Sequence, residues 1–536
     1  MFISWGVLLG FTIVVFDGAK TIGGNKIYVC EGAIEEDKGL FLDFGMNYAK
    51  REKIFSDFLS ERSIRGIHDL VYLNLVPRLN IYREDLIPSD LDVSSFPSLN
   101  VEAVLLSHAH LDHCGNIGLL RLDIPVVTSA ISAAILKGLR DTSPAMLGKE
   151  VAYFSPKEQC NEDNRVLKSS YKGNYLGRNF YSTSKCKEEF YEFLSSRPGD
   201  SSPRARKVLE PGNSCHVDEK ELSFDFKTYP VDHSIYGANA YLIYGDSVLA
   251  YTGDFRLHGK NAWKSEEFVK AAKEASILLI EGTRVGIKEE AEEEDESEES
   301  EEIVYETCLK AVDESEGLVI ADFSPRHFER LETFKEIAEK TGKQLVVTSK
   351  DAYMLHAVEC CDGINRMEDV LIYNELKETS KCKWEVEIVK ERWGDNYLDP
   401  VDISRNPENY IACFSYYDVK HLLDIKPNNG SYIYSSSEAF QEEQEFNFFR
   451  LYNWLDRFNF RIYGFEILEE EAGGKQKPIF IKGYHASGHA SEKDIRRVID
   501  TIDPEIVIPI HTENPEWFSE NFENAMILEE GKKYEF

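Results

Sequence analysis

The apolar positions near the start of the chain fall in short runs separated by turn signals. The runs "FTIVVF", "KIYVCEG" and "GLFLDFG" are rich in β-branched and aromatic residues, which is typical of strands. The apolar run "VEAVLL" (101–106) predicts a further buried strand, and "AISAAILKGLRD" after it has the apolar spacing of a helix. Strands that alternate with helices predict an α/β fold.

A polar passage over about 173–213 interrupts this pattern and predicts loops with a short helix. Strand patterns resume in "ELSFDFKTYPVDHS", "SVLAYTGDF" and "ASILLIEGT". Further on, "GLVIADFS", "RHFERLETFKEIAEKTGK" and "QLVVTS" follow in the strand, helix, strand order of a parallel sheet. The last part predicts a helix in "EKDIRRVIDTI" and a strand in "EIVIPIHTE".

The length of 536 residues exceeds the size at which a single hydrophobic core usually stops growing, so we expect at least two domains. None of the ten cysteines forms a Cys-x-x-Cys pair, and a reducing cytoplasm is the expected location. The uncharged start "MFISWGVLLGFTIVVF" lacks the basic residues of a signal peptide and is short for a membrane span. We therefore expect no membrane association and assign "FTIVVF" to the first core strand.

The net charge of -34 is unusual for a protein that binds a polyanion. The segment 289–302, "EEAEEEDESEESEE", holds 11 acidic residues among 14, and we expect it to be a disordered acidic loop. Outside this loop 23 negative charges remain, which is 34 minus 11. Any groove for a nucleic acid must therefore be a local basic exception on an acidic surface.

Candidate chemistry begins in "LLSHAHLDHCGN" (105–116), which places His108, His110, Asp112 and His113 directly after a predicted strand. Neutral imidazoles and carboxylates are preferred zinc ligands. The alternate spacing lets His108 and His110 converge on one ion while Asp112 and His113 turn toward a neighbouring one. Other histidines and acids also follow predicted strands, namely Asp43, His233, Asp254, Glu281, His485, His489 and His511.

Together these motifs resemble those of metallo-β-lactamase-fold nucleases that carry a β-CASP domain, and most of all those of ribonuclease J-like proteins. The residues that match the family's motifs are, in chain order, Asp43, "HAHLDH" (108–113), His233, Asp254, Glu281, His489 and His511. The resemblance implies an α/β fold in which an αββα sandwich, formed by residues 1–282 and 477–536, carries an inserted β-CASP α/β domain over 283–476.

The resemblance also implies two bound zinc ions. The implied ligands are His108, His110 and His233 for one ion, Asp112, His113 and His511 for the other, and Asp254 bridging both. Two cations about 3.5 to 4 Å apart lower the pKa of a water and stabilise the charged oxygens of a phosphoryl displacement. Asp112 therefore counts among the catalytic residues as well, and Mn²⁺ is a second candidate metal at carboxylate-rich positions.

Three further roles follow from the same resemblance and from the needs of the reaction. Asp43 would hydrogen-bond a ligand imidazole and fix its tautomer. His489, oriented by Glu281, would be the general acid for the leaving ribose oxygen. Polar loops and helix starts of the inserted domain suit phosphates, and the expected phosphate contacts are Arg326, His327, Ser435, Ser436, Ser437, His485 and Ser487.

The leading hypothesis is a two-zinc ribonuclease that acts on single-stranded RNA as a 5′-to-3′ exonuclease in RNA processing or decay, with endonuclease activity as an additional option. A DNA-processing β-CASP nuclease is a second hypothesis, although such relatives usually carry valine where this chain has His511. A small-molecule hydrolase of the same fold is a third, and a non-catalytic RNA-binding subunit is a fourth. The inserted domain argues against the third and the complete ligand set against the fourth. The assembly stays open, with a homodimer as one option.

Overall fold

The computed structural model describes residues 10–56, 58–144, 146–286, 300–378, 382–436, 442–468 and 477–536. The apolar start of the chain before residue 10, most of the acidic run and Ser437 lie outside these residues. Within the described part of the chain, no helix combines the length and apolar character that a membrane span requires.

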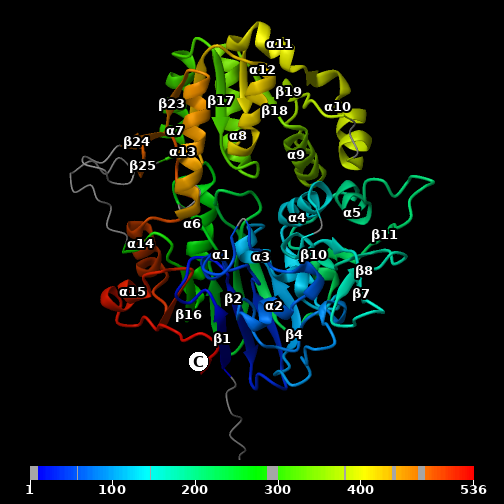
Figure 1. Cartoon of the computed structure of the whole chain (residues 1–536). Coiled ribbons are helices and arrows are strands. Elements are labelled where there is room, and N and C mark those ends of the chain that lie inside the picture. The colour runs from blue at the N-terminus through cyan, green and yellow to red at the C-terminus, as the bar shows by residue number, and fades with distance from the viewer. Residues whose placement is uncertain are drawn as a thin grey trace, which may run out of the picture.

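The lower half of the molecule is built on two β-sheets that face each other (Figure 1). One sheet has eight strands, in the order β12 (Ser214–His216), β10 (Phe180–Ser182), β5 (Val126–Thr128), β4 (Asn100–Leu105), β3 (Lys38–Leu42), β2 (Lys26–Glu31), β1 (Phe11–Asp17) and β27 (Lys533–Glu535). The other has five, in the order β13 (Asp225–Pro230), β14 (Asn239–Tyr244), β15 (Val248–Tyr251), β16 (Ile277–Glu281) and β26 (Ile506–Ile510).

Apolar side chains of both sheets form one buried cluster between them, which includes Ile13, Leu105, Leu279 and Ile508. Helices α6 (Ala262–Ala271), α14 (Glu492–Ile502) and α15 (Pro515–Asn521) contribute to a second cluster with the five-stranded sheet. Helix α4 (Ala130–Thr142) packs with the eight-stranded sheet. The predicted αββα sandwich is therefore confirmed.

A third sheet forms the upper half of the molecule in Figure 1. Its strands are all parallel, in the order β20 (Tyr397–Leu398), β19 (Val370–Tyr373), β18 (Gln344–Val347), β21 (Tyr410–Cys413), β17 (Leu318–Asp322), β22 (Gly430–Tyr434) and β23 (Phe460–Tyr463). Its main helices are α7 (Glu301–Asp313), α8 (Phe328–Thr341), α9 (Ser349–Asp362), α11 (Pro400–Arg405), α12 (Leu422–Ile425) and α13 (Glu442–Arg457). The predicted strand, helix, strand unit is present as β17, α8 and β18, but β21 lies between the two strands.

Two sequence expectations need correction. Glu301 and Glu302 do not belong to an acidic loop, because they begin α7, and the Glu301 side chain is buried in ion pairs with Arg256 and Arg330. The polar passage over about 173–213 contains the expected short helix, α5 (Glu188–Ser195), but also the strand β10 in the eight-stranded sheet. Because β10 is only three residues long, it is too short to show a periodic pattern.

Parallel pairing brings the carboxyl ends of several strands to the same edge of the sandwich. Leu42 at the end of β3 pairs with Leu105 at the end of β4. In the other sheet β15, β16 and β26 run parallel, and Glu281 pairs with Ile510. The predicted site residues that follow these strands therefore meet between the two sheets, beneath the seven-stranded domain.

Candidate functional site

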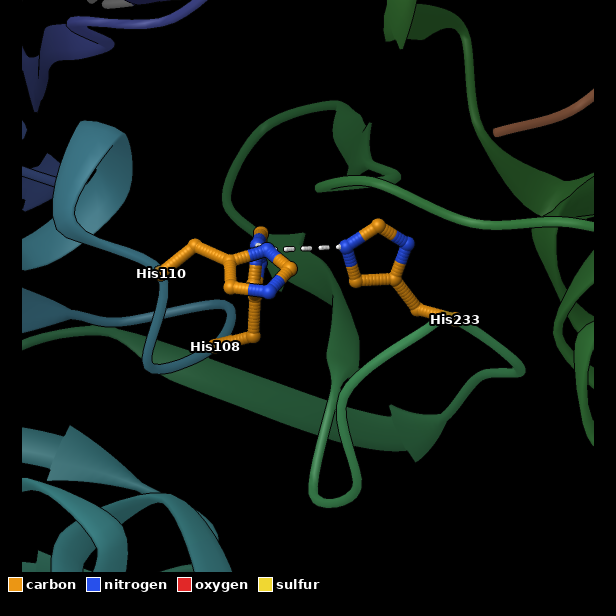
Figure 2. Close-up of side chains that lie close together, drawn as sticks. All are labelled: His108, His110 and His233. Atoms are coloured by element: carbon orange, nitrogen blue, oxygen red, sulfur yellow. Dashed lines mark hydrogen bonds between the residues drawn. The ribbon is translucent and has the colours of Figure 1, made fainter. Parts of the chain in front are cut away.

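Three histidines form the first group of the site (Figure 2). His108 follows β4, His110 precedes the short helix α3 (Leu111–Cys114), and His233 follows β13. His110 Nδ1 lies 3.0 Å from His108 Nε2 and 3.2 Å from His233 Nε2. The ring nitrogens thus converge on one point, as the alternate spacing predicts.

Asp112, His113 and His511 form the second group. Asp112 Oδ2 lies 3.3 Å from His511 Nε2 and 3.8 Å from His113 Nε2. The imidazole rings of His113 and His511 stack with their centroids 5.0 Å apart. Asp112 and His511, which are 399 positions apart in the sequence, therefore meet here. His511 directly follows β26, and Asp112 lies in the loop and short helix that follow β4.

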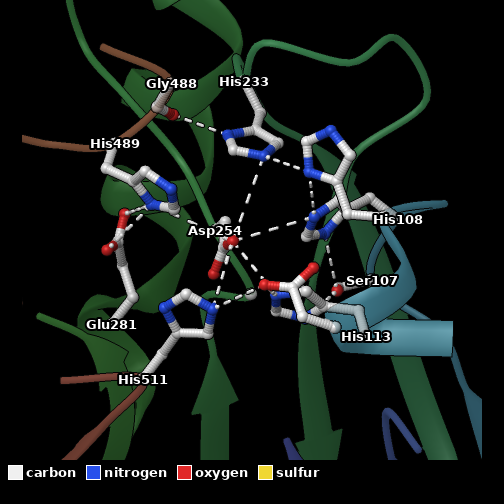
Figure 3. A network of polar contacts seen from close by, with 12 residues as sticks. Ser107, His108, His113, His233, Asp254, Glu281, Gly488, His489 and His511 are labelled. Atoms are coloured by element: carbon white, nitrogen blue, oxygen red, sulfur yellow. Dashed lines mark hydrogen bonds and ion pairs between the residues drawn. The ribbon is translucent and has the colours of Figure 1, made fainter. Parts of the chain in front are cut away.

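Asp254 lies between the two groups (Figure 3). Its Oδ2 is 3.0 Å from His113 Nε2, 3.7 Å from His108 Nε2 and 3.7 Å from His511 Nε2. The same oxygen is 4.0 Å from His233 Nε2. A single carboxylate oxygen is thus within reach of both sets of donors.

The donor set fits metal ions. Nitrogen and oxygen atoms with lone pairs face one another, and the buried atom Asp254 Oδ1 has no hydrogen-bond partner among the described residues. Burial and the neighbouring imidazoles lower the pKa of His108 and His110 well below the ordinary value, and burial lowers the pKa of His233 to about 4. These imidazoles are neutral at pH 7, which is the form that binds metals.

Asp43 contacts the second group through Nδ1 of His113. This fully buried carboxylate lies 2.6 Å from His113 Nδ1 and accepts hydrogen bonds from the backbone N–H and the hydroxyl of Ser107, each at 2.7 Å. The hydroxyl of Tyr251 donates a fourth hydrogen bond at 2.5 Å. Asp43 and His511 both have left-handed backbone, with φ of 57° and 51°, a conformation uncommon outside glycine and concentrated at functional sites.

His489 and Glu281 lie beside the metal-binding groups. Both carboxylate oxygens of the buried Glu281 are 3.2 Å from His489 Nδ1, and Asp254 Oδ2 is 3.9 Å from the same nitrogen. Burial lowers the pKa of His489, but the carboxylates of Glu281 and Asp254 outweigh it and raise the pKa to about 9. His489 can therefore hold a proton near the centre.

The residues expected to contact phosphate differ in their surroundings. Arg326 is partly exposed, and its Nη1 lies 3.4 Å from the backbone oxygen of Ala109 in the histidine loop. His327 is 3% exposed and its Nδ1 accepts from the backbone N–H of Arg330, so it caps α8. Ser435 is fully buried against Arg330. Both side chains are therefore buried, and His327 Nε2 has no hydrogen-bond partner among the described residues. Their contact with phosphate stays a prediction.

The other expected phosphate contacts lie nearer the surface. His485 and Ser487 are partly exposed, and the Ser487 hydroxyl accepts from the backbone N–H of His489 at 3.1 Å. Ser436 is 7% exposed. Ser437 lies outside the described residues.

Sequence reasoning missed three residues of the site. Thr283 Oγ1 lies 2.9 Å from His511 Nδ1 and 3.1 Å from His489 Nδ1, so it links the two rings. Tyr251, in the opposite sheet, donates a hydrogen bond from its hydroxyl to Asp43. Arg256, two residues after Asp254, is fully buried between carboxylates of both halves of the molecule. The position of Thr283 just after the motif residue Glu281 is the signal in the sequence that could have found it.

Comparisons with known proteins agree with this geometry. Residues 82–279 match the metallo-beta-lactamase superfamily, and residues 481–531 match the Zn-dependent metallo-hydrolase RNA specificity domain. The chain is 22% identical over 453 residues to Ribonuclease J of Pyrococcus abyssi (strain GE5 / Orsay), which covers 83% of this chain and 81% of that protein. A crystal structure of a protein of unknown function from Enterococcus faecalis V583 has the same fold, with a TM-score of 0.66 and 21% identity over 98% of this chain and 100% of that chain.

Both sequence matches coincide with the segments that supply the metal-binding side chains, and the fold match extends over the inserted sheet. These matches support a metal-dependent hydrolase of the metallo-β-lactamase type, and the chain is similar to ribonuclease J-like proteins over most of its length.

Proposed function

We propose that this protein is a two-metal ribonuclease that hydrolyses single-stranded RNA as a 5′-to-3′ exonuclease, with endonuclease activity as an additional option. The observation that carries the proposal is the position of Asp254, whose Oδ2 lies within 4.0 Å of ring nitrogens from both donor groups. The match to an RNA specificity domain and the similarity to Ribonuclease J support RNA as the substrate.

In this proposal each donor group holds one zinc ion, with Mn²⁺ as a second candidate. The proposed ligands are His108, His110 and His233 for one ion, Asp112, His113 and His511 for the other, and Asp254 for both. When bound, such a pair of ions lowers the pKa of a water and stabilises the charge of a phosphodiester during displacement. Asp112 would contribute to catalysis through the second ion.

The chain's own side chains would orient the ligands and move one proton. Asp43 faces Nδ1 of His113 and leaves Nε2 of that ring for the metal. His489 directs Nδ1 at Glu281, so the proton for the leaving ribose oxygen would be held at Nε2. Arg326, above the histidine loop, and Ser487, beside His489, are the proposed phosphate contacts.

The domain limits and cellular role belong to the same proposal. Residues 283–476 would form the inserted β-CASP domain, which covers the centre from above (Figure 1). The reaction would serve RNA processing or decay in the cytoplasm, by a monomer or a homodimer.

The test uses RNA labelled at either end that carries a 5′-hydroxyl, monophosphate or triphosphate, together with DNA of the same sequence. We expect stepwise release of mononucleotides from the 5′ end of RNA. Internal fragments from every kind of end would show an endonuclease, and preferred hydrolysis of DNA would show a DNA-processing enzyme. Rapid lactone or thioester hydrolysis without cleavage of either nucleic acid would overturn the proposal.

A further inference from the structure

The loop 484–489 carries His489, the proposed general acid, and its backbone oxygens accept hydrogen bonds from side chains elsewhere in the chain. The oxygen of Gly488 accepts from Nδ1 of His233 at 2.6 Å (Figure 3). The oxygen of Ser487 lies one residue earlier, and its donors have no part in the proposed mechanism. Both donors come from the segment that follows β15.

Two side chains donate to the backbone oxygen of Ser487. His258 Nε2 lies 2.9 Å from this oxygen, and Arg256 Nη1 lies 3.3 Å from it. Because a carbonyl oxygen only accepts, Nε2 of His258 carries the proton of this hydrogen bond. A carbonyl oxygen has two lone pairs, and these two donors occupy both. His258 and Arg256 therefore fix the position of Ser487 relative to the sandwich.

His258 suits this place because it donates without a charge. Burial, and after it the charge of Arg256, lower the pKa of His258, so its imidazole is neutral at pH 7. A lysine or an arginine at position 258 would add a second positive charge beside Arg256, and like charges repel. A neutral imidazole supplies the second donor to Ser487 without this repulsion.

Ser487 connects its backbone oxygen to the ring of His489. The Ser487 hydroxyl accepts from the backbone N–H of His489 at 3.1 Å, so the hydrogen bonds at Ser487 also position the backbone of His489. The ring then directs Nδ1 at both carboxylate oxygens of Glu281, each 3.2 Å away. A shift of the Ser487 oxygen would therefore move Nε2 of His489, which holds the proton for the leaving ribose oxygen in the proposed mechanism.

The two donors differ in what else depends on them. The guanidinium of Arg256 lies within 3.3 Å of three carboxylates, those of Asp232, Glu301 and Glu329. Replacement of Arg256 would disturb these buried ion pairs together with its hydrogen bond to Ser487. His258 is partly exposed, and its replacement removes the hydrogen bond to Ser487 without leaving a buried charge unpaired. At His258 the position of the loop can therefore be tested apart from the stability of the protein.

We propose that His258 is a positioning residue of the reaction: its Nε2–H fixes the oxygen of Ser487 and thereby the place of the His489 ring at the leaving ribose oxygen. The inference rests on the proposed function, because His258 acts through His489. When the bond between phosphorus and the ribose oxygen breaks, the proton moves from Nε2 of His489 to that oxygen. A displacement of about 1 Å costs about 10²-fold in rate. A leaving group that departs as a stable anion does not need this proton.

The test compares His258→Leu, which removes the donor, with His258→Gln, whose side-chain nitrogen lies as many bonds from Cβ as Nε2 of the ring. The control is His68→Leu, at the first position of α2 (His68–Tyr72), because His68 is also a partly exposed histidine and makes none of these contacts. On the zinc-loaded proteins we measure kcat and KM for a single-stranded RNA, kcat for bis(p-nitrophenyl) phosphate, zinc content and melting temperature.

We expect kcat for RNA to fall by about 10²-fold in His258→Leu, while KM, zinc content and melting temperature stay near those of the control. Turnover of bis(p-nitrophenyl) phosphate should not change, because p-nitrophenolate leaves without a proton. His258→Gln should recover most of the loss on RNA. The double variant His258→Leu/His489→Ala should be no slower than His489→Ala, because His258 acts through that ring.

Equal losses on RNA and on bis(p-nitrophenyl) phosphate would overturn the inference, and so would additive losses in the double variant. A kcat for RNA in His258→Leu equal to that of the control would overturn it as well. If His258→Leu does not fold, His258→Asn takes its place, because the shorter amide does not reach the oxygen of Ser487.

A wild-type protein that cleaves no RNA would overturn the proposed function instead. Crystal structures of the zinc-loaded wild type and of His258→Leu, in one crystal form, would then decide the inference. We expect the His489 ring to move relative to Glu281 in the variant, and the same position of the ring in both structures would contradict the role of His258.

Discussion

Substitution of Asp43 by asparagine tests a residue that hydrogen-bonds a proposed metal ligand but is not itself a proposed ligand. The carboxylate meets four hydrogen-bonding groups, two of Ser107, one of Tyr251 and Nδ1 of His113, at 2.5 to 2.7 Å. An asparagine side chain has one carbonyl oxygen and an NH₂ group that donates, so about two of the four donors lose their acceptor. Each unsatisfied buried group costs about 1–3 kcal/mol, so the free energy of unfolding should fall by about 2–6 kcal/mol.

Metal affinity should fall as well, because the amide no longer fixes the tautomer of His113. Loss of such a supporting group weakens metal binding by about 10- to 100-fold. The assay is competition with a chelator of known zinc affinity, run beside urea unfolding of the metal-free protein. Asp246→Asn, at the exposed turn between β14 and β15, makes the same chemical change away from the centre and should alter neither quantity. Wild-type zinc affinity in folded Asp43→Asn protein would refute the proposed role of Asp43.

Three further variants test other parts of the site. His489→Ala should keep both metals and lower kcat by about 10²- to 10⁴-fold, the contribution of a general acid, as metal analysis and single-turnover kinetics would show. Gly45→Ala should reduce the metal content, because the added Cβ would lie 1.6 Å from the backbone oxygen of Asp112. Arg256→Met should lower the free energy of unfolding by about 3–5 kcal/mol in urea, because it leaves the buried Glu301 and its neighbouring carboxylates without this partner.

Each of these variants has an outcome that contradicts the reasoning. Full activity of His489→Ala would exclude His489 as the acid. Normal zinc content of Gly45→Ala would show that the backbone at Asp112 can move away from the added Cβ without loss of metal binding. An unchanged free energy of unfolding in Arg256→Met would mean that the buried ion pairs of Arg256 make no net contribution to stability.

The sequence predicts the parts of the site that follow strands. His108, Asp254 and His511 stand directly after apolar runs, and parallel strands end at one edge, so their convergence follows from local pattern and fold class. The identity of their neighbours does not follow, because it depends on long-range packing. Thr283 reaches both His489 and His511 only once β16 and β26 are paired.

Burial explains where the sequence interpretation differs from the structure. Glu301 stands in an acidic run, yet it is 1% exposed because Arg256 and Arg330 bring two positive charges to the start of α7. The place of His327 at a helix start predicts a phosphate contact, and burial adds that Nδ1 of its ring caps α8. The composition of a segment does not show which distant residues pack against it. Arg256 and Arg330, the partners of Glu301, lie outside the acidic run.

The most direct test of the two-metal centre is X-ray diffraction at the zinc absorption edge from crystals of the wild-type protein grown with zinc. We predict two anomalous peaks, one beside His108, His110 and His233 and one beside Asp112, His113 and His511, with Asp254 touching both. A single peak, or a pair of peaks that Asp254 does not share, would contradict the proposal.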